Sequence, residues 1–148
     1  IAVAMDMNAS YNKLVTKHLP KAQIVYDRFH MQSQFGRDVL DAVRLDEARR
    51  HKAKEKEILA DISDDTDKET MKSLKQEAKA EKQEYSQLKK LRWSLLINSD
   101  KLSDSKTEQL QSILQDHHDL AVCYAMKEEM CRLYELTDYQ QAVTGWTK

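Results

Sequence analysis

Two short apolar runs and a series of longer amphipathic segments alternate along this chain. The apolar runs cover residues 1–5 and 22–26, and each ends abruptly at an aspartate, Asp6 and Asp27 respectively. Between the runs, residues 9–18 place apolar side chains near one face of a helix. The pattern therefore predicts strand, helix, strand and helix, with connections short enough for a right-handed crossover between parallel strands. Because two strands do not make a stable sheet alone, we expect neighbouring strands elsewhere in the protein or in another chain.

From Arg28 onward the pattern predicts helices and no strand. Residues 61–67 are strongly polar and favour the tip between two long helices. The returning helix carries an apolar seam with heptad-like spacing, which Glu81 interrupts. The seam consists of Met71, Leu74, Ala78, Tyr85 and Leu88. We expect this returning helix to end at residues 98–100.

Further helices are expected toward the end of the chain. Ser103 is a candidate cap for a helix whose apolar side chains fall at residues 110–114. The helical pattern then continues over residues 120–136, and Gly145 is expected to break it before Trp146.

The composition supports a mostly helical chain. Only 2 glycines and 1 proline occur among 148 residues. That is too few to punctuate a sandwich, barrel or propeller, which need turn signals every ~8–12 residues. It also excludes a P-loop and a dinucleotide-binding turn, because each needs glycines close together. The net charge is −1, whereas a dedicated non-specific nucleic-acid binder is clearly basic. No apolar run approaches the ~18 residues of a membrane span, so we expect no membrane association.

The two cysteines indicate a reducing compartment. Cys123 and Cys131 lie eight residues apart in a helical pattern. Eight helical residues rise ~12 Å, which exceeds the ~7 Å that a disulfide allows between Cα atoms. We therefore expect two reduced, buried thiols in a cytoplasmic protein. The chain opens at Ile1, without a start methionine and inside an apolar run, so we also expect it to be a fragment.

Asp6, Asp27 and His30 are the candidate functional residues. In α/β sheets functional groups gather at the carboxyl ends of parallel strands, so each aspartate stands where a metal-binding carboxylate belongs. Each aspartate also precedes a predicted helix, and capping of that helix is the alternative role. His30 follows Asp27 by three residues and would face the same side of the first helical turn. A single histidine near an aspartate is more often a local hydrogen-bond partner than a metal ligand, so both roles stay open.

Other metal-binding patterns are weaker. His117 and His118 are adjacent on a predicted helix, so their side chains point ~100° apart and cannot share one ion. Neither cysteine belongs to a CxxC pair, which argues against a structural zinc site built on thiolates.

Two stretches of the sequence resemble insertion-sequence transposases of the ISL-three family. Residues 6–34 contain the pattern DM-x-x-x-Y followed by LP-x-A-x-IV-x-DRFH. Residues 91–130 resemble the helical region of that family. The resemblance covers most of the chain and leaves residues 46–90 as a variable hairpin.

The resemblance implies a fold as well as a family. Such proteins are DDE transposases, whose RNase H-like α/β core is interrupted by an all-helical insertion domain. This chain would be mostly α with a small βαβ piece. Residues 1–30 would form part of the catalytic core and residues 31–148 the insertion domain. Within that domain, a long helical hairpin would span about 31–97 and a helical bundle 103–148.

The resemblance also implies roles for the candidate residues. Asp6 matches the second of the three catalytic carboxylates, and Asp27 and His30 match the D-x-x-H signature that follows it. In the complete site Asp6 would bind Mg²⁺ or Mn²⁺, because strand transfer uses two divalent ions ~3.5–4 Å apart. Asp27 is expected to cap the helix that begins near Arg28 and His30 to lie close to Asp6, so that the pair orients the site without binding metal directly.

This sequence departs from the family pattern in several ways. The first catalytic Asp and the final Glu have no counterpart here, and neither has the N-terminal zinc-ribbon and helix-turn-helix region. The chain lacks two of the three carboxylates, so we expect it to bind no metal and to have no activity alone.

These observations lead to two functional hypotheses. The first is a fragment of a bacterial DNA transposase, a protein that cleaves and transfers DNA strands at transposon ends and target DNA. We expect it to be a homo-oligomer associated with the nucleoid while acting. The alternative is a non-catalytic helical module in which residues 31–96 mediate dimerisation or docking. An exposed Asp6 beside free space favours the first hypothesis, and an unburied apolar face on the hairpin favours the second.

Overall fold

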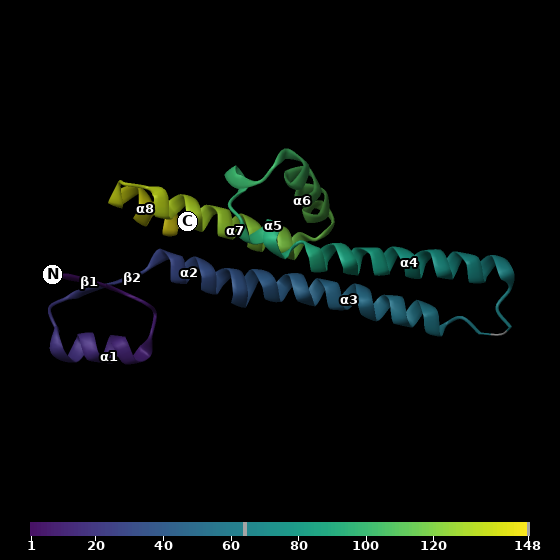
Figure 1. The fold of residues 1–148 in the computed structure, drawn as a ribbon, viewed down its shortest axis with the longest axis horizontal. Helices are drawn as coiled ribbons and strands as arrows, with labels where there is room; N and C mark the ends of the chain where they lie inside the picture. Colours follow the sequence, from purple (N-terminus) through teal and green to yellow (C-terminus); the bar gives the residue numbers. More distant parts are fainter. Residues whose placement is uncertain (64, 148) are drawn as a thin grey trace. The chain divides into compact units, whose positions relative to one another are not determined.

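The computed structural model describes residues 1–63 and 65–147, so Asp64 of the predicted tip and Lys148 lie outside it. The chain is mostly helical with one small sheet, as predicted (Figure 1). Its elements are β1 (Ala2–Met5), α1 (Ala9–His18), β2 (Gln23–Tyr26), α2 (Arg28–Phe35), the π-helical turn η1 (Gly36–Leu40), α3 (Asp41–Ala60), α4 (Lys68–Lys90), α5 (Arg92–Leu96), the 3₁₀ turn η2 (Ser99–Lys101), α6 (Asp104–Asp116), α7 (His118–Glu135) and α8 (Tyr139–Trp146).

The contacts between residues divide the chain into two compact units. One unit comprises Ile1–Val39 and Met126–Lys148, and the other comprises Leu40–Ala125. The predicted domain boundaries at residues 30, 97 and 103 stay predictions, because they refer to the catalytic core and the insertion domain of a complete transposase.

The first unit contains the predicted strand, helix and strand. β1 and β2 pair in parallel, with Ala2 opposite Gln23 and Met5 opposite Tyr26. Helix α1 connects them with the predicted bounds, and the side chain of Asn8 accepts a hydrogen bond from the backbone N–H of Ser10 at its start (2.8 Å). The prediction of two short parallel strands from the two apolar runs, with a helix between them, is therefore confirmed.

Gly145 does not break the last helix, contrary to the sequence prediction. It lies inside α8, and a Cβ atom at this position would overlap Cδ2 of Leu133 on α7. The absence of a side chain lets the two helices approach closely. The ring of Trp146 packs edge-on against Tyr134, with the ring centroids 5.9 Å apart. Tertiary packing thus outweighs the weak helix propensity of glycine here.

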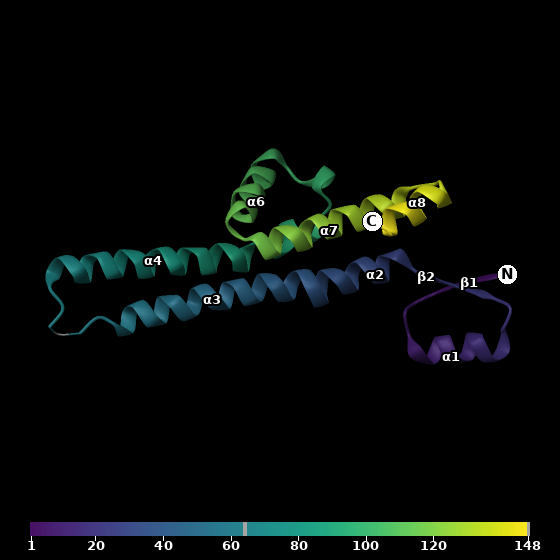
Figure 2. The ribbon, with the colours of Figure 1, turned by 180° about the vertical axis from the view of Figure 1, so that it is seen from behind.

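The second unit is built on the α3–α4 hairpin. Figures 1 and 2 show α3 and α4 side by side and antiparallel, as expected from the polar tip at 61–67. The predicted seam of α4 faces inward: Ala78 and Leu88 are buried, and the other seam residues are half-buried. Against this hairpin, α5, α6 and the start of α7 contribute the remaining core side chains, among them Leu91, Leu95, Leu110, Ile113 and Leu120.

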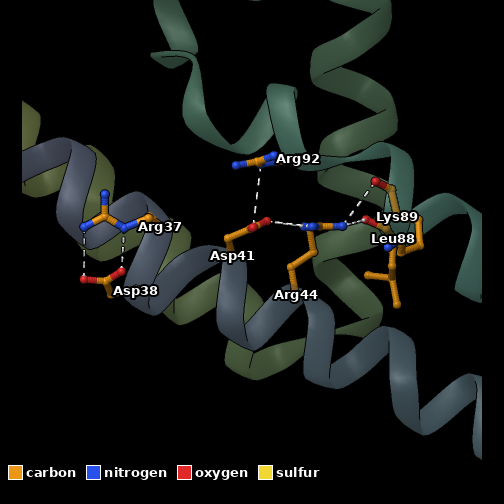
Figure 3. Close-up of polar contacts among 7 residues, drawn as sticks. All are labelled: Arg37, Asp38, Asp41, Arg44, Leu88, Lys89 and Arg92. Carbon is orange, nitrogen blue, oxygen red and sulfur yellow. Dashed lines mark hydrogen bonds and ion pairs between the residues drawn. The ribbon is translucent and has the colours of Figure 1, made fainter.

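Arg44 is a buried cation that connects α3 to the end of α4 (Figure 3). Its Nη1 donates to the carbonyl oxygens of Leu88 (2.9 Å) and Lys89 (3.1 Å). On the other side its guanidinium contacts Oδ1 of Asp41, with Nε at 2.8 Å and Nη2 at 2.6 Å. Arg92 approaches the second oxygen of Asp41 at 3.6 Å. The charge of Arg44 is therefore compensated by a carboxylate and two carbonyl groups.

The same contact explains why α4 ends at Lys90 and not at residues 98–100 as predicted. In a continuing α-helix, the carbonyls of Leu88 and Lys89 would accept hydrogen bonds from residues four positions later. Arg44 donates to both carbonyls instead, the Leu88 carbonyl also accepts from the N–H of Leu91 (3.3 Å), and the chain turns at Leu91 before the short helix α5 begins. A long-range contact of this kind leaves no signal in the local sequence pattern.

Both cysteines are reduced thiols, as predicted, but only Cys131 is buried, whereas Cys123 is half-buried. Burial is the main cause that raises the pKa of Cys131, and it likewise raises the pKa of Cys123. In the described part of the chain, no helix combines the length and apolar character that crossing a bilayer requires.

We expect Arg44→Ala to lower the free energy of unfolding by about 3 kcal/mol, because it leaves Asp41 and the end of α4 without their charged partner. The matched control is Arg49→Ala on the exposed face of α3, which should change the value by less than about 0.5 kcal/mol. Chemical denaturation of both variants measures the difference. Equal losses for the two arginines would contradict the role assigned to Arg44.

Candidate active site

Asp6 and Asp27 are brought together by the parallel pairing of β1 and β2. The last pair in the register is Met5 opposite Tyr26, so the aspartates directly follow neighbouring strand ends. The backbone N–H of Asp27 donates to the carbonyl of Met5 (3.1 Å), which extends the ladder to the aspartate. Both carboxylates therefore emerge at the carboxyl edge of the sheet, where sequence analysis placed them.

His30 completes a cluster with the two aspartates. Its Nε2 lies 2.8 Å from Oδ1 of Asp6 and 3.8 Å from Oδ2 of Asp27. The shorter distance is a close ion-pair contact and the longer one is a weaker electrostatic contact. The side chains of all three remain about half exposed, at 45% for His30, 52% for Asp6 and 47% for Asp27. The structure thus places His30 next to Asp6, as predicted.

Asp27 also performs the predicted capping. Its Oδ1 accepts a hydrogen bond from the backbone N–H of Phe29 (2.9 Å), which satisfies one of the free donors at the start of α2. Because α2 starts at this cap, His30 sits in its first turn and faces back toward the strand ends. The capping role and a role at the site are therefore compatible.

An open pocket of about 300 Å³ lies beside this cluster. Besides Asp6 and His30, it is lined by Met7, Asn8, Ser33, Gln34 and Arg37. Arg37 is held by Asp38 through a hydrogen bond from Nε to Oδ1 (2.8 Å; Figure 3). This hydrogen bond is the main cause that raises the pKa of Arg37 and lowers the pKa of Asp38. The pocket thus combines the carboxylate of Asp6 and the imidazole of His30 with the guanidinium of Arg37.

The donor atoms of the cluster are compatible with a divalent ion. One atom each from Asp6, Asp27 and His30 lies within 4.8 Å of the others. Mg²⁺ is bound in proteins by one or two carboxylates together with several waters. Two exposed carboxylates at one sheet edge match this requirement in part, and further oxygen ligands have room to join them.

Sequence analysis missed a second group, in the α3–α4 hairpin. Glu47, His51 and His117 also bring one donor atom each within 4.8 Å of one another. His117 has His51 on α3 as its neighbour, with the ring centroids 5.3 Å apart. Two signals in the sequence pointed to it: Glu47 and His51 share one helix face, and Glu81 interrupts the apolar seam opposite them.

Comparison with known proteins identifies the family. The model of the ISL-three family, described as "Transposase", matches residues 1–148. The chain belongs to the ISL-three transposase family. It is also 32% identical over 133 residues to the transposase for insertion sequence element IS1001 of Bordetella parapertussis. The predicted family is therefore confirmed.

The match to the Bordetella transposase covers 90% of this chain but only 26% of that protein. The chain thus spans about a quarter of the length of this family member. No solved structure matches the chain.

The capping role of Asp27 can be separated from other roles by two substitutions. We expect Asp27→Ala to lower the free energy of unfolding by about 1 kcal/mol, whereas Asp27→Asn should be nearly neutral because asparagine caps equally well. Thermal unfolding followed by circular dichroism measures both. A similar loss for both substitutions would show that charge, not the capping hydrogen bond, stabilises the start of α2.

Proposed function

We propose that this chain supplies part of the active site of a DNA transposase, with Asp6 as the second of three catalytic carboxylates. The observation that carries the proposal is the position of Asp6: it follows a parallel strand, stays half exposed and lines an open pocket with His30. Membership of a transposase family supports the same activity. β1, α1 and β2 then belong to an RNase H-like core, and residues 31–148 form an all-helical insertion domain.

The reaction is cleavage and strand transfer of DNA at transposon ends. Asp6 holds Mg²⁺ or Mn²⁺ together with the other two carboxylates of the complete DDE site. When bound, the metal ions activate the attacking oxygen and stabilise the leaving oxygen of the phosphodiester. A carboxylate at a strand end suits this task because hard divalent cations prefer oxygen ligands.

The residues around Asp6 determine how its carboxylate is presented. Nε2 of His30 lies 2.8 Å from Oδ1 of Asp6 and holds the carboxylate at the pocket, where Asp6 would contribute oxygen ligands to the ion. Asp27 caps α2 and thereby fixes the turn from which His30 projects. Asp27 and His30 are positioning residues in this proposal, and Asp6 alone is a catalytic ligand.

The alternative hypothesis, a non-catalytic helical module, required an unburied apolar face on the hairpin. The seam of α4 packs against α3 of the same chain, and its central residues Ala78 and Leu88 are buried. By contrast, Asp6 meets the requirement of the catalytic hypothesis. The insertion domain can still contact DNA or another subunit in the complete transposase.

Self-association is the second part of the proposal, and it rests on the sheet. In the described residues the sheet has two strands only, so each strand has an open edge that can recruit another strand. The seam of α4 would contribute only if its own chain left it uncovered, and α3 packs against it.

We expect the chain to form dimers or larger species at high micromolar concentration, as measured by sedimentation equilibrium. Val25→Lys on β2 should weaken this association, since a lysine at an exposed edge disfavours strand pairing. Leu59→Lys on α3 is the matched control, because Leu59 and Val25 are equally exposed (46%). A monomeric mass for the unmodified chain at all concentrations would contradict the proposal.

In the full-length transposase, Asp6→Asn should reduce DNA cleavage and strand transfer by at least about 1000-fold, the effect of losing several kcal/mol of metal-based stabilisation. The fold should not change, because Asp6 is half exposed and asparagine has nearly the same shape. Cleavage of end-labelled transposon DNA with Mg²⁺ or Mn²⁺ measures the activity.

Asp61→Asn at the exposed end of α3 is the control for this experiment and should retain full activity. The isolated chain should cleave no DNA, because one catalytic carboxylate cannot hold two ions. Normal transposition by the Asp6→Asn protein would refute the proposed role, and so would metal-dependent cleavage by the isolated chain that Asp6→Asn abolishes.

A further inference from the structure

A second polar cluster lies inside the helical unit, away from the strand ends. Glu47 and His51 come from α3, Glu81 and Glu84 from α4, and His117 from the junction of α6 and α7. The rings of His51 and His117 pack edge to face, with their centroids 5.3 Å apart. Three separate segments thus direct two imidazoles and three carboxylates toward one another.

His117 is the buried member of this cluster, and one of its nitrogens makes no hydrogen bond. The residue is 6% exposed, and its Nε2 is buried without any hydrogen bond. Oε2 of Glu84 lies 3.8 Å from Nε2, and Oε2 of Glu47 lies 3.6 Å from Nδ1. Both distances exceed a hydrogen bond. A buried polar atom without a hydrogen bond is energetically unfavourable, and a bound ion is one of the ways in which such an atom is satisfied.

The spacing of the donors suits ligands of a shared ion. Zinc binds imidazole nitrogen and carboxylate oxygen at about 2.0–2.1 Å, so two of its tetrahedral ligands lie about 3.4 Å apart. The separation of 3.6 Å between Oε2 of Glu47 and Nδ1 of His117 is close to this value, and Oε2 of Glu84 lies slightly farther, at 3.8 Å, from the buried Nε2. Donor atoms of Glu47, His51 and His117 all lie within 4.8 Å of one another. Small side-chain rotations therefore complete the contacts.

The second oxygen of Glu47 and the second nitrogen of His51 are already occupied. Arg50 binds Oε1 of Glu47 (2.9 Å), which leaves Oε2 facing His117. Oε2 of Glu81 lies 2.6 Å from Nδ1 of His51 and accepts a hydrogen bond from it, so the lone pair of the imidazole is on Nε2. A carboxylate in this position is typical of a histidine that binds a metal, because it fixes the tautomer and the ring orientation.

We propose that Glu47, His51 and His117 bind a divalent transition-metal ion of the zinc type, with Glu81 as the positioning carboxylate. Two imidazoles favour zinc or cobalt over Mg²⁺, which prefers an all-oxygen shell. The ion connects α3 to the α6–α7 junction and neutralises the carboxylates that surround His117. It braces the hairpin at its base and takes no part in DNA cleavage.

Titration of the metal-free full-length protein with Co²⁺, a probe with visible absorption bands, tests this proposal. The background carries Asp6→Asn and His30→Gln, which remove the other cluster. The protein should bind Co²⁺ at a site that His51→Gln and His117→Gln each weaken by more than 100-fold, beyond the ~10–100-fold typical of an orienting group. With Zn²⁺ at ~100 times its dissociation constant, the unfolding midpoint should rise above that of the metal-free protein.

His118→Gln is the matched control, because His118 is adjacent but exposed, and it should bind Co²⁺ like the parent. Glu81→Gln should keep the same absorption bands at about 10–100-fold lower affinity, which separates positioning from ligation. Glu47→Gln, at a half-buried position, provides a third ligand variant if His117→Gln does not fold. Co²⁺ binding by the ligand variants at the affinity of the parent would overturn the proposal, as would a parent protein that binds no more Co²⁺ than the His51→Gln variant.

Discussion

The contact between Arg44 and the end of α4 fixes the register of the helical hairpin. The guanidinium reaches the carbonyls of Leu88 and Lys89, and Asp41 compensates its charge from the preceding turn. His51 lies seven residues after Arg44 on α3, and Glu81 lies seven residues before Leu88 on α4. Because the helices are antiparallel, one register places both pairs opposite each other, and the 2.6 Å contact between His51 and Glu81 follows from it. The polar cluster of the hairpin therefore depends on this one buried cation.

Much of the fold could be predicted from local pattern. Apolar runs that end at Asp6 and Asp27 indicated the two strands, and helical spacing indicated α1 with its observed bounds. The prediction was wrong where tertiary contacts decide the outcome. The helix α4 ends early because Arg44 takes its last carbonyls, and Gly145 stays helical because it lies against Leu133. Neither partner is near in sequence, so a local pattern contains no information about them.

The two polar clusters differ in how visible they are to sequence reasoning. Asp6, Asp27 and His30 could be predicted as neighbours because parallel strand ends meet at one edge and a cap is followed by its first turn. Glu47, His51 and His117 come from a helix pair and a later junction, and their approach depends on the register of the hairpin. The sign of this approach in the sequence was Glu81, a charged residue that interrupts the apolar seam. Its partner is His51.

The two clusters also differ in the chemistry that they favour. At the strand ends, two carboxylates and one imidazole are half exposed, which suits a weakly held hard cation whose shell other oxygen ligands complete. In the hairpin, the two imidazoles, Glu47 and Glu81 are largely withdrawn from water, which suits a borderline ion held by nitrogen and oxygen ligands of the protein. The cluster at the strand ends is open to solvent and to further ligands, whereas the cluster in the hairpin lies between three segments of the chain. Similar residue types therefore favour different cations in the two places.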